Sequence, residues 1–168
     1  GERGEAGLDF LQAENHFAAA LELDPDNLFT RDEYARVCFN LADLEAGPTA
    51  QAYWQKSLDA FEAVMATDPK TGLSEASLRE SAAFWAYARA KCGQFDAARQ
   101  QLWLMATLAP QDWFPRYLLA GVHLLDHFFD LVHAALVEDG VLEQFVQPSA
   151  RDQVADDVKH PVGTERLA

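Results

Sequence analysis

Apolar side chains recur along this chain at intervals of three and four residues, which is the spacing of helices that bury one face. No segment has the pattern that is typical of a strand. The spacing predicts helices over residues 8–24, 30–45, 50–67, 78–92, 96–108, 113–127 and 129–137, followed by a last apolar turn at 141–146. The sequence therefore predicts an all-α protein.

Local signals mark where several of these helices begin and end. Two capping-box pairs, which predict the starts of the second and fourth helices, are Thr30 with Glu33 and Ser77 with Glu80. Turn-forming residues at 24–27, 47–48 and 68–72 predict breaks between helices.

A spacing of apolar residues and proline occurs three times within the helices. In each copy a small residue is followed by a bulky apolar residue, then by a medium one, and then by a proline that ends the helix. The copies are Ala13, Phe17, Ala20 and Pro25, then Ser57, Phe61, Val64 and Pro69, then Ala98, Leu102, Met105 and Pro110. Such repetition is typical of a solenoid, in which each helix pair packs against its neighbours.

The segment 91–98, followed by Leu102, Met105 and Pro110, resembles the helix junction and second helix of a tetratricopeptide repeat (TPR), and so does the segment 13–25. The resemblance covers residues 8–137. It implies a right-handed α-solenoid of about three to four helix pairs, of which the first is partial, with a C-terminal capping helix. We expect the repeat domain to span residues 8–147 and a flexible tail to span 148–168.

The spacing departs from the TPR pattern at two places. Ala35 and Ser57 are separated by ten more residues than the family pattern has, and Pro69 and Ala86 by seven more. We expect the first insertion in a loop around residues 45–51 and the second around residues 70–77.

In the TPR family the first helix of each pair lines a concave surface on which ligands bind. The resemblance implies partner-binding positions at Phe29, Asp32, Glu33, Arg36, Glu80, Phe84, Tyr87, Phe114 and Tyr117. Aromatic anchors with an acidic rim suit an apolar helix or an extended segment that carries lysine or arginine. The basic and amide residues that clamp a peptide carboxylate in some TPR proteins are absent. The alternative is that Phe84 and Phe114 pack between repeats or under the C-terminal helix.

The chain carries 27 acidic and 13 basic residues and has a formal charge of −14. This charge disfavours nucleic acid and anionic lipid as partners. Solvation of the surface is our main interpretation of the acidic residues, and recognition of a basic partner is the second. Cys38 and Cys92 lie in apolar helical patterns and lack a metal or redox motif, so we expect reduced thiols and favour a cytoplasmic location. No apolar run is long enough to span a membrane.

His123 and His127 are four residues apart, and Asp130 follows three residues later, so the three side chains could share a helical face and bind a divalent metal. We favour the alternative that these are ordinary helical residues, and we expect no metal and no cofactor. The sequence contains no phosphate-binding glycine loop and no nucleophile elbow, so we expect no catalysis.

These observations lead to two hypotheses. The first is a non-catalytic scaffold or adaptor that binds a partner protein or peptide in an aromatic and acidic groove. The second is a structural subunit of a larger assembly or a homo-oligomer, in which the apolar stretch 128–146 forms the interface.

Overall fold

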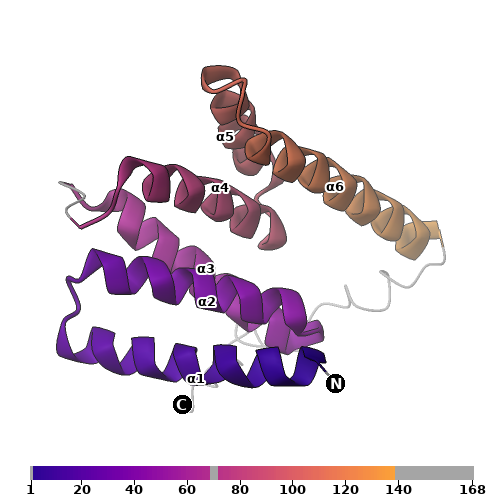
Figure 1. Ribbon diagram of the computed structural model, residues 1–168. Helices are drawn as coiled ribbons and strands as arrows, with labels where there is room; N and C mark the ends of the chain where they lie inside the picture. Colours follow the sequence, from indigo (N-terminus) through magenta and orange to yellow (C-terminus); the bar gives the residue numbers. More distant parts are fainter. Residues whose placement is uncertain (1, 69–71, 139–168) are drawn as a thin grey trace, which may run out of the picture. The chain divides into compact units, whose positions relative to one another are not determined.

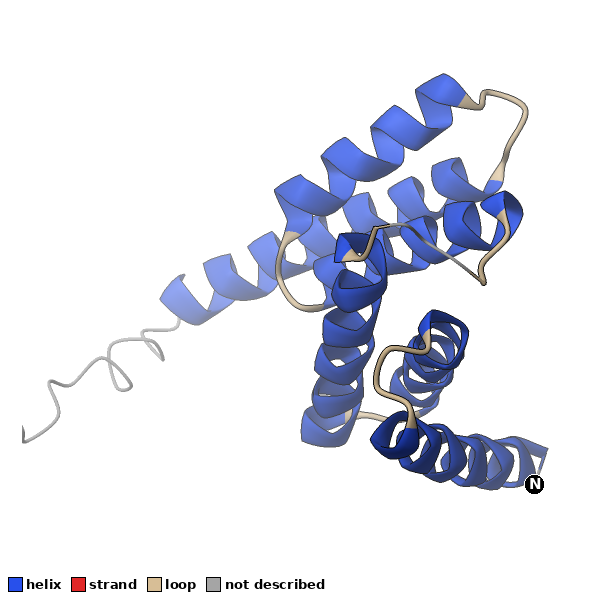
Figure 2. Ribbon diagram, turned by 90° about the vertical axis from the view of Figure 1, so that its left-hand side faces the viewer, coloured by secondary structure: helices blue, strands red, loops and turns tan. Residues whose placement is uncertain are grey.

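The computed structural model describes residues 2–68 and 72–138, and these residues form six α-helices and no strand (Figures 1 and 2). The helices are α1 (Glu2–Leu23), α2 (Leu28–Leu44), α3 (Gly47–Ala66), α4 (Glu75–Lys91), α5 (Phe95–Leu108) and α6 (Phe114–Glu138). The prediction of an all-α protein is confirmed. No helix in this part of the chain is long and apolar enough to cross a membrane.

The chain comprises two units, residues 1–127 and 128–168, whose boundary lies inside α6. In the first unit each of the helices α1 to α4 contacts the next helix along the chain, and α2 also contacts α4. Short connections favour this packing of sequential neighbours. Of the second unit, only residues 128–138 are described, and they are helical. The expected apolar turn at 141–146, the domain boundary at 147 and the tail lie outside the described residues.

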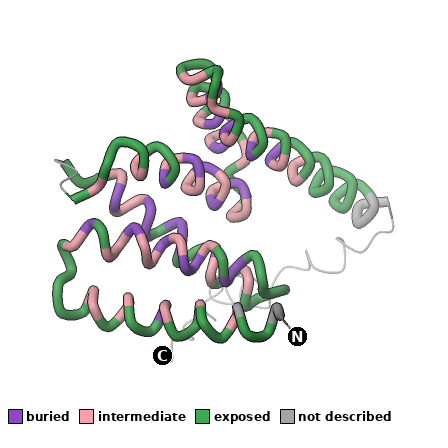
Figure 3. Tube along the Cα trace, viewed as in Figure 1, coloured by how far each residue is buried: buried purple, intermediate pink, exposed green. Residues whose placement is uncertain are grey.

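The core of the first unit is built where small residues let helices approach and larger ones fill the space between them. Ala35, Ala86 and Ala98 are completely buried, and so are Phe61 and Leu102. Burial of each of these two larger side chains contributes about 1.5–3 kcal/mol. Buried residues gather along α2, α3 and α4, whereas most of α1 is exposed or half-buried (Figure 3). The repeated spacing therefore marks core positions in its second and third copies more strongly than in its first; Pro69 itself is outside the described residues.

The expected insertion in a loop around residues 45–51 is wrong, because only Glu45 and Ala46 connect α2 and α3. The additional residues lengthen the two helices instead. Gly47 and Pro48 begin α3, although we expected them to end α2. Proline is tolerated in the first turn of a helix, where its missing N–H would have no partner in the helix.

Both expected capping boxes are wrong, since the two helices begin earlier. Asn27 caps α2, and its side-chain oxygen accepts a hydrogen bond of 3.0 Å from the backbone N–H of Thr30. Ser74 caps α4 in the same way, with a 3.0 Å bond from the backbone N–H of Ser77. The connection before α4 spans residues 67–74, of which residues 69–71 are outside the described part.

The break that we expected near residue 128 is also wrong, because α6 is one continuous helix from Phe114 to Glu138. No proline or glycine interrupts residues 122–138, so nothing in the backbone chemistry stops the helix there.

Candidate functional site

A network of hydrogen bonds and ion pairs around Arg36 joins α2 to α4. Arg36 Nε lies 3.0 Å from Asp32 Oδ2, and Nη1 lies 2.6 Å from Glu80 Oε2. Nη2 donates to Ser81 Oγ at 2.7 Å and to the backbone oxygen of Ser77 at 3.3 Å. Asp32 and Ser81 are completely buried, so one guanidinium group bonds buried polar side chains of both helices.

Arg36 remains charged in this environment. Burial is the largest single influence and lowers the pKa of its guanidinium, but the hydrogen bonds and the negative charges of Glu80 and Asp32 together raise the pKa, and the net direction is upward. Two carboxylates therefore neutralise Arg36, and its hydrogen bonds join α2 to α4.

A cavity of about 730 Å³ opens beside this network. Residues of α2 and α4, one residue of α5, and the start of α6 with the loop before it form its wall. The lining residues are Glu33, Arg36, Ala76, Ser77, Arg79, Glu80, Ala83, Phe84, Met105, Asp112, Trp113, Phe114 and Pro115.

Aromatic rings form the apolar part of the wall. The ring centroids of Phe84 and Phe114 are 5.3 Å apart and those of Trp113 and Phe114 are 5.7 Å apart, both with the edge of one ring toward the face of the other. This arrangement is the favourable one for aromatic pairs. Trp113 is 68% exposed, so it offers a large apolar surface at the edge of the cavity.

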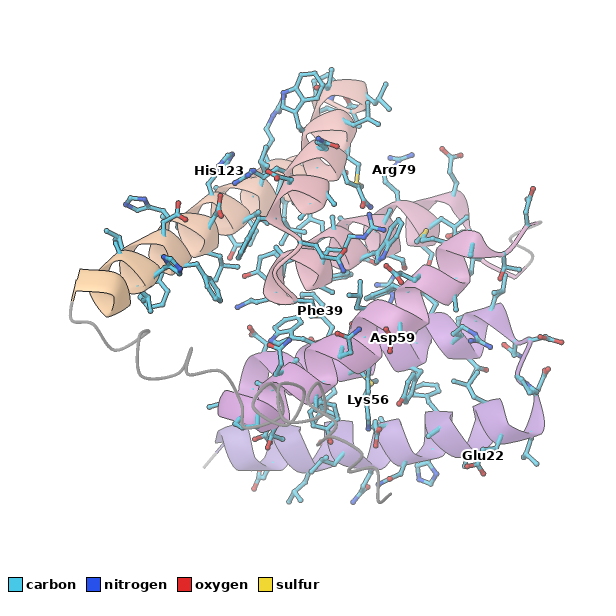
Figure 4. The ribbon with its side chains drawn as sticks, turned by 180° about the vertical axis from the view of Figure 1, so that it is seen from behind. Glu22, Phe39, Lys56, Asp59, Arg79 and His123 are labelled. Atoms are coloured by element: carbon cyan, nitrogen blue, oxygen red, sulfur yellow. The ribbon has the colours of Figure 1, made fainter. Side chains whose placement is uncertain are left out.

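Charged groups surround the rings. Arg79 extends from α4 and forms an exposed ion pair of 3.1 Å with Glu75 (Figure 4). Asp112 Oδ1 accepts a 3.0 Å hydrogen bond from the backbone N–H of Phe114 and so supports the start of α6. Glu33 takes part in no ion pair among residues 2–68 and 72–138. The cavity thus combines aromatic rings with more negative than positive charge.

Five of the nine expected partner-binding residues line this cavity, namely Glu33, Arg36, Glu80, Phe84 and Phe114. Phe84 and Phe114 also pack against each other, as the alternative interpretation expected. The same two rings therefore contribute to the packing of α4 against α6 and to the wall of the cavity.

The other four expected residues do not line it. Phe29 is exposed, and Asp32 is buried and bonded to Arg36. Tyr87 is half-buried with its ring 6.1 Å from that of Trp54. Tyr117 is exposed and packs on Trp113.

Sequence reasoning missed Trp113, Met105 and Asp112 as lining residues. Met105 belongs to the second helix of a pair, and Trp113 and Asp112 precede α6, so the family pattern did not select them. One sequence signal could have indicated these residues. A short polar turn precedes Phe114 and Pro115, and Asp112 in this turn caps the helix that follows.

The hypothetical metal site at His123 and His127 gains no support. Within the part of the chain that the structure describes, no three side chains of histidine, cysteine, aspartate or glutamate are grouped so that they could hold a metal ion. Both cysteines are free, Cys38 in the core and Cys92 half-buried.

The chain matches no family model, none of the curated proteins and none of the solved structures with which it was compared. The interpretation of its function therefore depends on the cavity and its surroundings.

Proposed function

We propose that this chain is a non-catalytic helical-repeat scaffold of the TPR type, which binds a segment of a partner protein in the cavity between α2, α4 and α6. The repeated spacing supports the TPR assignment, because the small residues Ala35, Ala86 and Ala98 of the family pattern are completely buried, although Ala13 of the first copy is only half-buried. In such a solenoid α2, α4 and α6 would be the first helices of successive pairs, and they contribute most of the residues around the cavity.

The observation that carries the proposal is the aromatic wall of this cavity. A volume of about 730 Å³ accommodates several side chains of a peptide, and Trp113 and Phe114 provide the kind of anchor that dominates many interfaces. The acidic residues around the rings and the net charge of −14 make nucleic acid an unsuitable partner.

Selection from a library of displayed random dodecapeptides tests this proposal. Peptides that bind are synthesised, and their affinities are measured for the original chain and for two variants, Trp113→Ala and Trp103→Ala. Trp103 is a matched control, since it is 61% exposed but lies on α5 outside the cavity. We expect Trp113→Ala to weaken binding about 30-fold and Trp103→Ala to have little effect.

Circular dichroism at 222 nm confirms that both variants keep their helices. If the selected peptides bind equally well to both variants, the cavity is not the binding site and the proposal fails.

A separate observation favours a second function, that of a structural subunit. Phe128, Phe129, Leu131 and Val132 are exposed on the part of α6 that belongs to the second unit. Clustered exposed apolar side chains often mark a protein interface. If the chain is a homo-oligomer through this segment, light scattering will give a dimer at all practical concentrations, and deletion of residues 128–168 will give a monomer. A monomeric full chain would exclude this form of self-assembly.

A further inference from the structure

A second cavity adjoins the first one at the ion pair between Arg36 and Glu80. Its volume is about 260 Å³, and its lining residues are Phe10, Glu33, Arg36, Val37, Phe39, Asn40, Glu80 and Phe84. Four residues line both cavities, namely Glu33, Arg36, Glu80 and Phe84. We call the cavity of about 730 Å³ the large compartment and the cavity of about 260 Å³ the small compartment.

Phe84 separates the two compartments. Its ring centroid lies 4.8 Å from that of Phe39, which lines the small compartment, and 5.3 Å from that of Phe114, which lines the large one (Figure 4 labels Phe39). The guanidinium carbon of Arg36 is 5.5 Å from the Phe84 ring centroid. Since Arg36 is held by Asp32 and Ser81, this boundary is in place before a ligand arrives, which lowers the entropic cost of binding.

Among residues 2–68 and 72–138, a carboxylate that forms no ion pair lies at the same boundary, in addition to that of Asp112 in the large compartment. Arg36 is paired with Asp32 and Glu80, and Arg79 in the large compartment is paired with Glu75. Glu33 lines both compartments and forms no ion pair in the described part of the chain. A positive side chain would complement Glu33, whereas a negative one would be repelled.

We propose that the groove formed by the two compartments binds an extended partner segment in which a lysine or arginine stands between two apolar side chains. One apolar side chain occupies each compartment, and the cation contacts Glu33. This inference rests on the proposed function and adds the chemistry of the partner. Alternate residues of an extended chain point to the same side, so the three side chains are two residues apart and together span about 13 Å.

The test uses synthetic peptides of defined sequence. The probe is a fluorescein-labelled nonapeptide, GSLSKSLSG, and three related peptides replace its lysine by glutamate or one of its leucines by serine. Fluorescence anisotropy measures their affinities for the original chain and for Glu33→Lys. We expect the lysine peptide to bind the original chain about tenfold more tightly than the glutamate peptide, and Glu33→Lys to reverse this preference.

Glu22→Lys is the matched control, because Glu22 is exposed on α1 and lines neither compartment (Figure 4). The Glu22→Lys variant has the same net charge as the Glu33→Lys variant. If Glu33→Lys and Glu22→Lys change the peptide preference equally, only the net charge matters, and the proposed contact with Glu33 is wrong.

Asn40→Trp tests the small compartment, which Asn40 lines from α2. A tryptophan there fills the compartment, so the peptide with two leucines should lose about fivefold in affinity, whereas the better of the two single-leucine peptides should bind as before. Unchanged affinity of the two-leucine peptide would overturn the proposal of two compartments.

These outcomes are distinguishable from failure of the proposed function. If library peptides depend on Trp113 but are indifferent to Glu33→Lys and Asn40→Trp, the scaffold proposal stands and this inference fails. If light scattering shows a dimer that Glu33→Lys dissociates, the occupant is a second copy of the chain, and the inference of a basic partner segment is wrong.

Discussion

Replacement of Arg36 by methionine should destabilise the first unit far more than its partly exposed position suggests. The side chain of Arg36 is 18% exposed, but that of Asp32 is only 1% exposed. Methionine keeps much of the aliphatic stem and removes the charge, so the carboxylate of Asp32 stays buried without a cation. Removing one partner of a buried ion pair costs about 3–5 kcal/mol.

Of the other contacts that this variant loses, those with Ser81 and Glu80 contribute different amounts to the free energy of unfolding. The hydroxyl of Ser81 loses a hydrogen bond of 2.7 Å in a fully buried place, which adds about 1 kcal/mol. Glu80 loses its ion pair as well, but its side chain is 52% exposed and regains water, so this loss adds little. The total is about 4–6 kcal/mol, which corresponds to a fall in melting temperature of roughly 15 °C.

Urea unfolding followed by circular dichroism at 222 nm measures the loss. Arg79→Met is the matched control, because the ion pair between Arg79 and Glu75 is exposed and should contribute less than about 1 kcal/mol. Combining Asp32→Asn with Arg36→Met should recover part of the stability, since no buried charge is left. If Arg36→Met and Arg79→Met lose the same small amount, or if the two substitutions of the double variant are additive, the structural role of Arg36 is refuted.

Three other changes test the fold. Leu102→Ala should lower the free energy of unfolding in urea by about 2–5 kcal/mol, whereas Leu108→Ala should barely change it because Leu108 is 75% exposed. Similar losses in the two variants would contradict the assignment of the core. Gly93→Ala should lower the free energy of unfolding by about 1–2 kcal/mol, because Gly93 has a φ of 85° that residues with a side chain rarely adopt, while Gly7→Ala inside α1 should not lower it. Equal melting temperatures of the two variants would contradict the positive φ at Gly93. Burial raises the pKa of the Cys38 thiol to about 11, whereas an unfolded thiol titrates near ~8.5, so the unfolded chain loses its proton first and stability should fall as the pH rises through this window. Cys38→Ala should reduce the fall between pH ~8 and ~10.5, and an identical fall in the variant would contradict it.

The helical character of the chain was predictable because helix formation depends on residues three and four positions apart. Of the small residues expected where paired helices cross, Ala86 and Ala98 are completely buried, whereas Ala13 is only half-buried. Helix ends were predicted less well. Several neighbouring residues could cap the same helix. Asn27 caps α2 instead of Thr30 because the preceding turn ends at Asn27.

The candidate site was only partly predictable. Phe84 and Tyr87 are three residues apart on α4 and look equivalent in the sequence, yet Phe84 lines the cavity and Tyr87 packs toward Trp54 of α3. Trp113 lines the cavity although the repeat pattern does not include this residue. The turn before α6 places the ring of Trp113 against that of Phe114.

The sequence by itself determined the helical character of the chain, the buried small residues Ala86 and Ala98 and the excess of acidic groups, because these follow from local spacing and composition. Only the tertiary structure decided that the additional residues between Ala35 and Ser57 extend α2 and α3 and form no loop. It also decided that Arg36 is bound to carboxylates of its own chain while Glu33 is left without a cation, since ion pairing depends on which side chains of separate helices meet.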